Sequence, residues 1–142
     1  MALTGLSAAG CGDDGPAPPI SQDEYEQHVA AACDQHGAAL AEAGQDFIDN
    51  AHSTSERVAY FRTEWIPRVR SIIHTLADGG FPEGHDGEYR AALSQVLTDL
   101  DDFEAHAVQF INDYQEGTIL PANDYPAKVQ RGLQTAGIDC VN

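Results

Sequence analysis

The chain has 142 residues, of which 23 are acidic and only 7 are lysine or arginine, so its formal net charge at pH 7 is −16. This length suffices for one domain with its own hydrophobic core but not for two. The charge disfavours binding to nucleic acid or to an anionic membrane surface. No run of about 18 apolar residues occurs, so no segment is expected to span a membrane.

The first ten residues, MALTGLSAAG, are small and apolar, but they are too short for a complete secretion signal and lack its basic start. The segment LSAAGC, which ends at Cys11, resembles the end of a bacterial lipoprotein signal peptide, with Ala8 where that family usually has leucine. The resemblance implies that residues 1–10 are a partial signal remnant and that Cys11 carries a diacylglyceryl lipid. It thereby implies an extracytoplasmic protein anchored to the bacterial cell membrane. The alternative is a disordered tail with an incidental cysteine.

Residues 11–20 consist of the anchor cysteine, Cys11, and the sequence GDDGPAPPI that follows it. Glycine, aspartate and three prolines in so short a stretch cannot form a core, which predicts an extended and disordered tether. A lipid-bearing residue needs such a spacer to hold its domain away from the bilayer. The tether therefore supports the interpretation of Cys11 as the lipid attachment site.

The first helix is expected over residues 22–50. Ser21 can cap its amino end, and acidic residues follow in the first turn. An apolar stripe recurs at helical spacing and includes Tyr25, Cys33, His36 and Phe47. The stripe is narrow and rich in alanine, so this helix is expected to pack closely.

A second helix is expected from the capping residues 53–55 to residue 79. Pro67 lies inside this helix and removes a backbone donor, so we expect a bend near Thr63 within one continuous helix. Several arginines flank the apolar stripe and are expected to reach acids on the first and third helices. These arginines are Arg57, Arg62, Arg68 and Arg70.

The third helix is expected over residues 86–116, where the apolar spacing is the most regular in the chain. A shorter fourth helix is expected over about residues 124–136, with Pro126 near its first turn and Gly137 as its stop. Four amphipathic helices joined by short or moderate loops predict an all-α fold. The expected architecture is a four-helix up-down bundle over residues 21–142, with a short fourth helix.

The chain has three cysteines, Cys11, Cys33 and Cys140. In the up-down topology the fourth helix ends beside the first half of the first helix, which brings Cys140 towards Cys33. A disulfide between them would close a loop of roughly a hundred residues, which loop entropy values at about 4 to 5 kcal/mol. The odd number of cysteines then leaves Cys11 for the lipid. The alternative is a reduced cytosolic protein with three thiols.

Two groups of residues are candidate metal ligands. Cys33 and His36 lie one turn apart and could bind zinc if Cys140 joined them. If the two cysteines pair instead, His36 becomes a core histidine, and Glu104 on the third helix is its expected neighbour. Asp99, Asp102 and His106 share one face of the third helix with Gln109 and Asp113, which could hold a divalent cation weakly or could simply be a solvated face.

Hydrolase, haem-attachment, nucleotide-binding and di-iron motifs are all absent from the sequence. The cysteine in the first helix and the ending GIDC at residues 137–140 resemble those of small secreted or lipid-anchored all-α proteins of high-GC Gram-positive bacteria. The sequence therefore predicts a non-enzymatic, envelope-anchored bundle that binds a protein or an envelope component. The alternative function is binding of a metal or small ligand through His36, His106 and the acidic residues.

Overall fold

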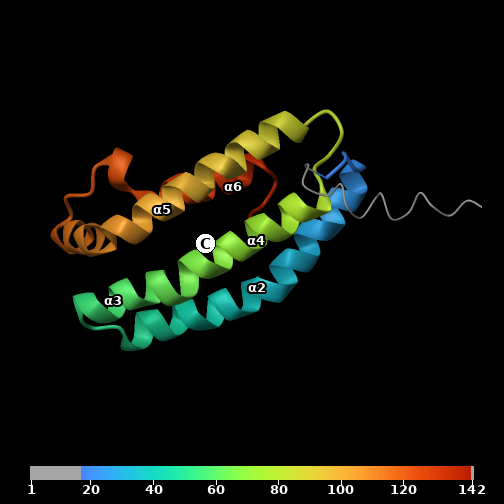
Figure 1. Ribbon diagram of the computed structural model, residues 1–142. Helices are drawn as coiled ribbons and strands as arrows, with labels where there is room; N and C mark the ends of the chain where they lie inside the picture. Colours follow the sequence, from blue (N-terminus) through green and yellow to red (C-terminus); the bar gives the residue numbers. More distant parts are fainter. Residues whose placement is uncertain (1–16, 142) are drawn as a thin grey trace, which may run out of the picture.

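The computed structural model describes residues 17–141, and this part of the chain is an all-α bundle, as the sequence predicts (Figure 1). Neighbouring helices alternate in direction and are joined by short connections. The main helices are α2 (Gln22–Asn50), α3 (Thr54–Tyr60), α4 (Ile66–Gly79), α5 (Asp86–Glu116) and α6 (Tyr125–Thr135). A π-helical turn, η1 (Phe61–Trp65), joins α3 to α4, and a 3-10 turn, η2 (Pro121–Asn123), precedes α6.

Local sequence signals set the helix ends. The Ser21 hydroxyl accepts a hydrogen bond from the Glu24 amide at 3.1 Å, and the Ser53 hydroxyl accepts one from the Glu56 amide at the same distance. Each bond satisfies an amide that has no partner within the helix. Gly117 closes α5 with a φ of 70°, a backbone conformation that glycine adopts at little cost.

The second helical run is continuous but irregular at the predicted place. Residues 54–79 form one run in which η1, centred on Thr63, replaces the α-helical pattern. The Ile66 amide donates to the Phe61 carbonyl, five residues back. Pro67 follows directly and has no amide to donate, which accounts for the irregularity at this position. The expected continuous helix is confirmed, and its irregularity takes the form of a π turn.

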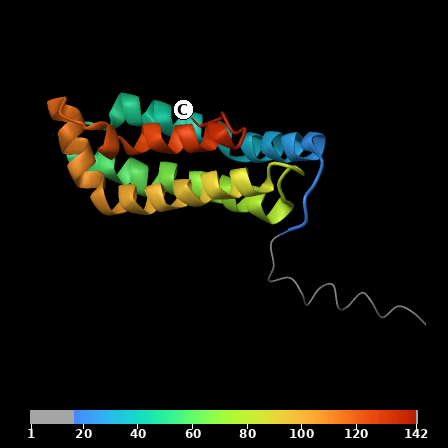
Figure 2. The ribbon, with the colours of Figure 1, turned by 90° about the horizontal axis from the view of Figure 1, so that it is seen from above.

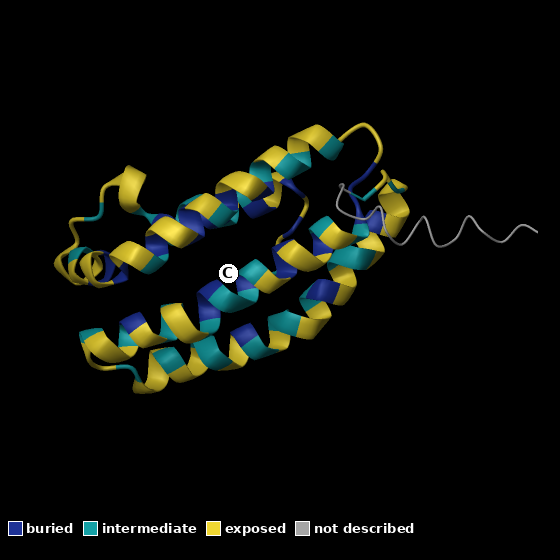
Figure 3. Ribbon diagram, viewed as in Figure 1, coloured by how far each residue is buried: buried dark blue, intermediate teal, exposed yellow. Residues whose placement is uncertain are grey.

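The hydrophobic core lies between α4, α5 and α6, whose inward faces are buried (Figure 3). The closest helix pairs are α5 with α6 and α2 with α4. A glycine allows the first of these contacts, because a Cβ at Gly132 would lie 2.3 Å from the Cγ2 of Val96. By contrast α2 buries only Tyr25, Ala32 and Leu40 over its whole length, so one of its flanks is left open.

The C-terminal segment ties α6 to α2. Cys33 and Cys140 form the predicted disulfide, which confirms that pairing over the alternative of reduced thiols at these two positions. Ile138 and Val141 of the same segment are buried. The Tyr25 hydroxyl donates to the backbone carbonyl of Ala136 just before it. This end of α6 is therefore fixed to the first half of α2, as the up-down topology predicts.

Residues 17–20 do not behave as the expected tether. The Ile20 amide donates to the Phe81 carbonyl and the Glu83 amide donates to the Ile20 carbonyl, both at 2.9 Å. Arg90 on α5 also donates to the Ala17 carbonyl at 3.2 Å. The boundary expected at residue 21 is corrected by these contacts, because the apolar side chain of Ile20 packs against the core beside the α4–α5 loop. Residues 11–16 lie outside the described part of the chain.

None of the helices in residues 17–141 is long and apolar enough to cross a membrane. Seen from above, the N-terminal segment and the α4–α5 loop lie at one end of the bundle (Figure 2). The C-terminal turns of α5 and the connection to α6 lie at the other end. The two ends are therefore separated by the length of the long helices.

Candidate functional site

The open flank of α2 forms one wall of a groove opposite α6. A cavity of about 430 Å³ lies here, and its α2 wall includes the small residues Gly37, Ala41 and Gly44. Phe61 and Trp65 line it from η1. α2 and α6 make little direct backbone contact, and the side chains that line the cavity fill the space between the two helices only in part.

A second cavity, of about 450 Å³, continues the first at the end of the bundle away from Ile20. The two cavities share four residues, Phe47, Ile48, Phe61 and Pro126. Together they form one continuous feature, which we call the apolar groove. The second cavity adds the following residues to its lining: Ala51, Arg57, Phe110, Ile111, Tyr114, Ile119 and Asp124.

Aromatic rings form the floor of the apolar groove. Phe61 lies with its centroid 5.8 Å from that of Phe47 and 5.8 Å from that of Trp65, and both pairs meet edge to face. Phe47 also stacks on Tyr60 at 4.5 Å. Phe61 and Trp65 both belong to the π turn, and single π turns in long helices occur frequently at functional sites.

A kink in α5 brings two aromatic side chains to the outer end of the groove. The helix is non-helical at His106, where φ is −112°, and its following turns bend across the end of the bundle (Figure 2). These turns carry Phe110 and Tyr114 to the groove. Tyr114 and Ile48 remain 66 % and 72 % exposed, so an apolar surface continues from the groove to the solvent.

Two charged side chains line this otherwise apolar end. Arg57 donates from Nε to the Ala51 carbonyl at 3.3 Å, and no carboxylate among residues 17–141 lies within ion-pair distance of it. Asp124 accepts a hydrogen bond at Oδ1 from the Ala127 amide at 3.3 Å and thereby caps α6. The carboxylate is held by the helix that it starts, whereas the guanidinium has only a neutral oxygen as its partner.

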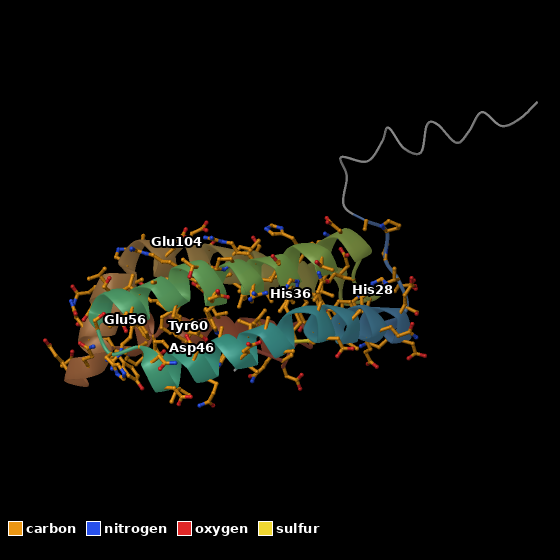
Figure 4. The ribbon with its side chains drawn as sticks, turned by 90° about the horizontal axis from the view of Figure 1, so that it is seen from below. His28, His36, Asp46, Glu56, Tyr60 and Glu104 are labelled. Atoms are coloured by element: carbon orange, nitrogen blue, oxygen red, sulfur yellow. A yellow bond between two sulfur atoms is a disulfide. The ribbon has the colours of Figure 1, made fainter. Side chains whose placement is uncertain are left out.

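An acidic cleft of about 600 Å³ lies between α2 and α3 near their turn (Figure 4). Asp46, Glu56 and Tyr60 line it, together with further acids and Arg68. The hydrogen bond that Glu56 accepts from the His52 amide is the main cause that lowers the pKa of the Glu56 carboxyl. Burial, with a contribution from the charge of Glu64, raises the pKa of Tyr60. The polar groups of this cleft largely serve the turn itself, so we do not assign it a ligand.

The zinc hypothesis for Cys33, His36 and Cys140 is corrected by the disulfide, since oxidised sulfurs are not thiolate ligands. The expected pair between His36 and Glu104 is also wrong. The Glu104 carboxylate binds Arg70 at 3.2 Å, while the buried Nδ1 of His36 has no hydrogen-bond partner in the described structure (Figure 4). Similar height along α2 and α5 did not bring the two side chains together, because α2 packs mainly on α4 and makes little direct contact with α5.

The acidic face expected on α5 is divided in the structure. Asp99 is buried, with 4 % of its surface exposed, and accepts from Gln95 at 3.1 Å. Its carboxylate also lies 3.4 Å from the Lys128 ammonium of α6, so the prediction that Asp99 faces solvent is wrong because α6 covers it. Asp102 and His106 stay exposed, and the His106 Nδ1 lies 2.8 Å from the Asp102 carbonyl.

The histidines and acidic residues considered as metal ligands therefore do not form one site; these are His36, Glu104, Asp99, Asp102 and His106. Across residues 17–141, no three histidine, cysteine or acidic side chains gather in a way that could hold a metal ion. The expected lipid site, Cys11, lies outside the described residues.

The arginine predictions have mixed outcomes. Arg70 reaches α5, where it pairs with Asp101 at 2.6 Å as well as with Glu104, as expected. Arg62 donates to the backbone carbonyl of Glu104 rather than to a carboxylate, and Arg68 pairs with Glu64 on its own helical run.

Sequence reasoning missed the apolar groove. Phe47 was placed on the core stripe of α2, while Ile48 beside it and the glycines Gly37 and Gly44 received no role. Glycine inside a helix costs about 1 kcal/mol relative to alanine, so two glycines and an exposed isoleucine along one helix were an available signal.

No protein-family model, no curated protein and no solved structure matches this chain. The case for a function therefore depends on the geometry and chemistry of the apolar groove.

Proposed function

We propose that this protein is an extracytoplasmic, non-enzymatic binding protein, anchored to the cell membrane through a lipid on Cys11, that holds an apolar component of the envelope in its groove. The observation that carries the proposal is the continuous apolar groove between α2, η1 and α6. Its two parts measure about 450 and 430 Å³, within the range of small-molecule sites, which also tend to be apolar with a few polar groups. The acidic composition argues against nucleic acid as the partner.

The groove is tested with an apolar fluorescent probe, N-phenyl-1-naphthylamine. Trp65 is the only tryptophan of the chain and lines the groove, so energy transfer from Trp65 reports a probe bound beside it. Gly37→Leu is the blocking variant, because a Cβ at Gly37 meets no atom within 4 Å and the larger side chain extends into the open groove. We expect saturable transfer in the wild type and at least a 10-fold loss of affinity in this variant.

The matched control is Ala38→Leu, which adds the same side chain on the adjacent, exposed position of α2 outside the groove. It is expected to bind the probe as the wild type does. Equal binding by both leucine variants, or no saturable binding by the wild type, would contradict the groove as a ligand site.

The anchor is tested by intact mass measurement on protein from the native membrane fraction. We expect a chain that begins at Cys11, carries a diacylglyceryl group there and contains an oxidised pair at Cys33 and Cys140. A protein that retains an unmodified Cys11 in that fraction would contradict the anchor and leave the groove to be judged by the probe experiment.

A further inference from the structure

Arg57 is the only basic side chain that lines the apolar groove among the described residues. Like Arg62 and Arg131, it has no carboxylate within ion-pair distance in residues 17–141, but neither of those two lines the groove. Arg68, Arg70, Arg90 and Lys128 each lie within 3.4 Å of a carboxylate oxygen. Arg57 lies at the outer end of the apolar groove and bonds only to the Ala51 carbonyl among the described residues. Asp124 lines the same cavity, but its carboxylate accepts from the Ala127 amide and does not pair with Arg57. The Arg57 guanidinium, beside apolar side chains, is therefore free to pair with a group from outside the chain.

We infer that the groove binds a single-chain amphiphile with an anionic headgroup, which pairs with Arg57 while its alkyl chain extends along α2 towards Trp65. This inference rests on the proposed function and names the class of its ligand. A guanidinium suits the geometry of a carboxylate or phosphate because it can donate two parallel hydrogen bonds. The alkyl chain replaces water on the aromatic floor formed by Phe61 and Trp65.

The shape of the groove favours a thin, elongated ligand. On the α2 wall of the inner cavity, Gly37, Ala41 and Gly44 leave room beside the larger apolar side chains of the same wall, which are Leu40, Phe47 and Ile48. The outer cavity has the aromatic residues Phe110 and Tyr114 together with Arg57. A ligand with a polar head and an apolar tail therefore meets its charge partner at the outer end and small or aromatic residues further in.

The net charge of the whole chain disfavours a second copy of the chain as the occupant of the groove, and it also gives no long-range attraction to an anionic ligand. A second copy of the chain would bring another net charge of −16 to this surface. An anionic head is also repelled at long range, but salt screens that repulsion beyond about 8 Å at physiological ionic strength. The short-range attraction between the headgroup and Arg57 is screened much less than this repulsion, because the alkyl chain has displaced water from the groove. Binding is therefore expected to strengthen as salt rises at low ionic strength.

The test compares four 16-carbon ligands below their aggregation limits, with Trp65 fluorescence as the readout. The ligands are hexadecanoate, hexadecyl phosphate, hexadecanol and hexadecylammonium. We expect the two anions to bind about 10-fold or more tightly than the alcohol, and the ammonium compound to bind no better than the alcohol. The two anions distinguish a free carboxylate from a phosphate head by their relative affinities.

Arg57→Gln is the diagnostic variant and Arg131→Gln is its control, since Arg131 is exposed on α6 and does not line the groove. Arg57→Gln is expected to lose the preference for the anions and to keep its affinity for hexadecanol, which also shows that the groove remains folded. Arg131→Gln is expected to keep the preference.

An unchanged preference in Arg57→Gln, or tightest binding of the ammonium compound, would overturn the anionic-head inference while leaving the groove intact. Failure of all four ligands to bind, together with failure of the naphthylamine probe, would overturn the proposed function as well.

Discussion

Tyr25 lies where α2, the α4–α5 loop and the C-terminal segment meet. It is 1 % exposed, and its ring centroid lies 5.9 Å from that of Phe81 and 5.4 Å from that of Tyr89. Its hydroxyl donates to the Ala136 carbonyl, which is otherwise enclosed at the end of α6. Burial, with a smaller effect from Tyr89, raises the pKa of Tyr25 above its ordinary value of 10.0.

This raised pKa predicts a loss of stability in alkali. The folded protein disfavours the charged phenolate of Tyr25. The contribution of the neutral hydroxyl to stability is therefore complete at pH values below about 10, the pKa of a tyrosine in the unfolded chain, and it declines as the pH rises above that value. The free energy of unfolding, measured with urea at several pH values, is expected to fall above pH about 10. In Tyr25→Phe this alkaline fall is expected to be smaller, at the cost of about 1 kcal/mol at neutral pH for the lost hydrogen bond. The same alkaline slope in both proteins would contradict the assignment to Tyr25.

A second residue-scale prediction concerns the contact of α5 with α6. A methyl group at Gly132 would lie 2.3 Å from Val96, a fully buried and stiff side chain. Gly132→Ala is expected to lower the free energy of unfolding by about 1–3 kcal/mol even though alanine is the better helix former. Adding Val96→Ala should make the cost of the glycine change smaller than it is in the wild-type background. A double-mutant cycle that shows no such coupling would contradict the close packing.

At the scale of elements, the disulfide closes a side of the bundle that helix packing leaves open. α2 and α6 make little direct backbone contact, and Cys33 is joined to Cys140 across 107 positions of sequence. Cys33→Ala with Cys140→Ala is expected to lower the free energy of unfolding by about 2–4 kcal/mol, chiefly because the unfolded chain gains freedom. Thermal and urea unfolding measure this change, and Cys11→Ser is the matched control. A pair of alanines as stable as the wild type would show that helix packing alone closes the bundle.

The elements that sequence predicts well are those set by neighbouring residues. Ser21 and Ser53 cap their helices, and Pro67 marks the irregular turn, because each acts on groups within a few positions of itself. The disulfide was predictable from topology, since an antiparallel short helix returns the chain to the start of the bundle.

Features that depend on helix rotation were not predictable from spacing alone. Asp99 is buried because α6 lies over that side of α5, and Glu104 turns to Arg70 rather than to His36. The apolar groove arises from the combination of the π turn, the kink at His106 and the weak α2–α6 contact. The π turn has a local cause in Pro67, but the open space between α2 and α6 depends on how the helices pack, which the spacing of residues within one helix does not show.

At the scale of the whole molecule, the net charge of −16 sets a background of self-repulsion. Apart from the pair between Lys128 and the buried Asp99, the ion pairs of the described residues are at least partly exposed, so each of these is worth no more than about 1 kcal/mol. Raising sodium chloride from about 0.01 M to about 0.15 M shortens the screening length from about 30 to about 8 Å. The melting temperature is therefore expected to rise over this interval, as measured by circular dichroism. A melting temperature that falls would show that attractive pairs outweigh the repulsion.

The outer cavity of the groove and the N-terminal segment lie towards opposite ends of the bundle. Figure 2 shows the last turns of α5, which line that cavity, and the N-terminal segment at these two ends. Ile20 fixes the chain to the α4–α5 loop, whereas the outer cavity, with Arg57 and Tyr114, lies by the α2–α3 turn. In the proposed lipoprotein, the anchor at Cys11 therefore leads into the end of the domain away from the outer cavity, where Arg57 lies. This arrangement suits a domain that receives its ligand from the side facing away from its own anchor.

The most direct test of the account is a map of amide chemical shifts in the isotope-labelled protein with and without hexadecanoate. We expect the largest changes along residues 37–48 of α2, in η1 and at the start of α6, the walls of the apolar groove. Residues that line the acidic cleft but not the groove, such as Asn50 and Arg68, and the N-terminal contact at Ile20 are expected to change little. Changes centred on either of those places, or none at saturating ligand, would contradict the assignment of the groove as the binding site.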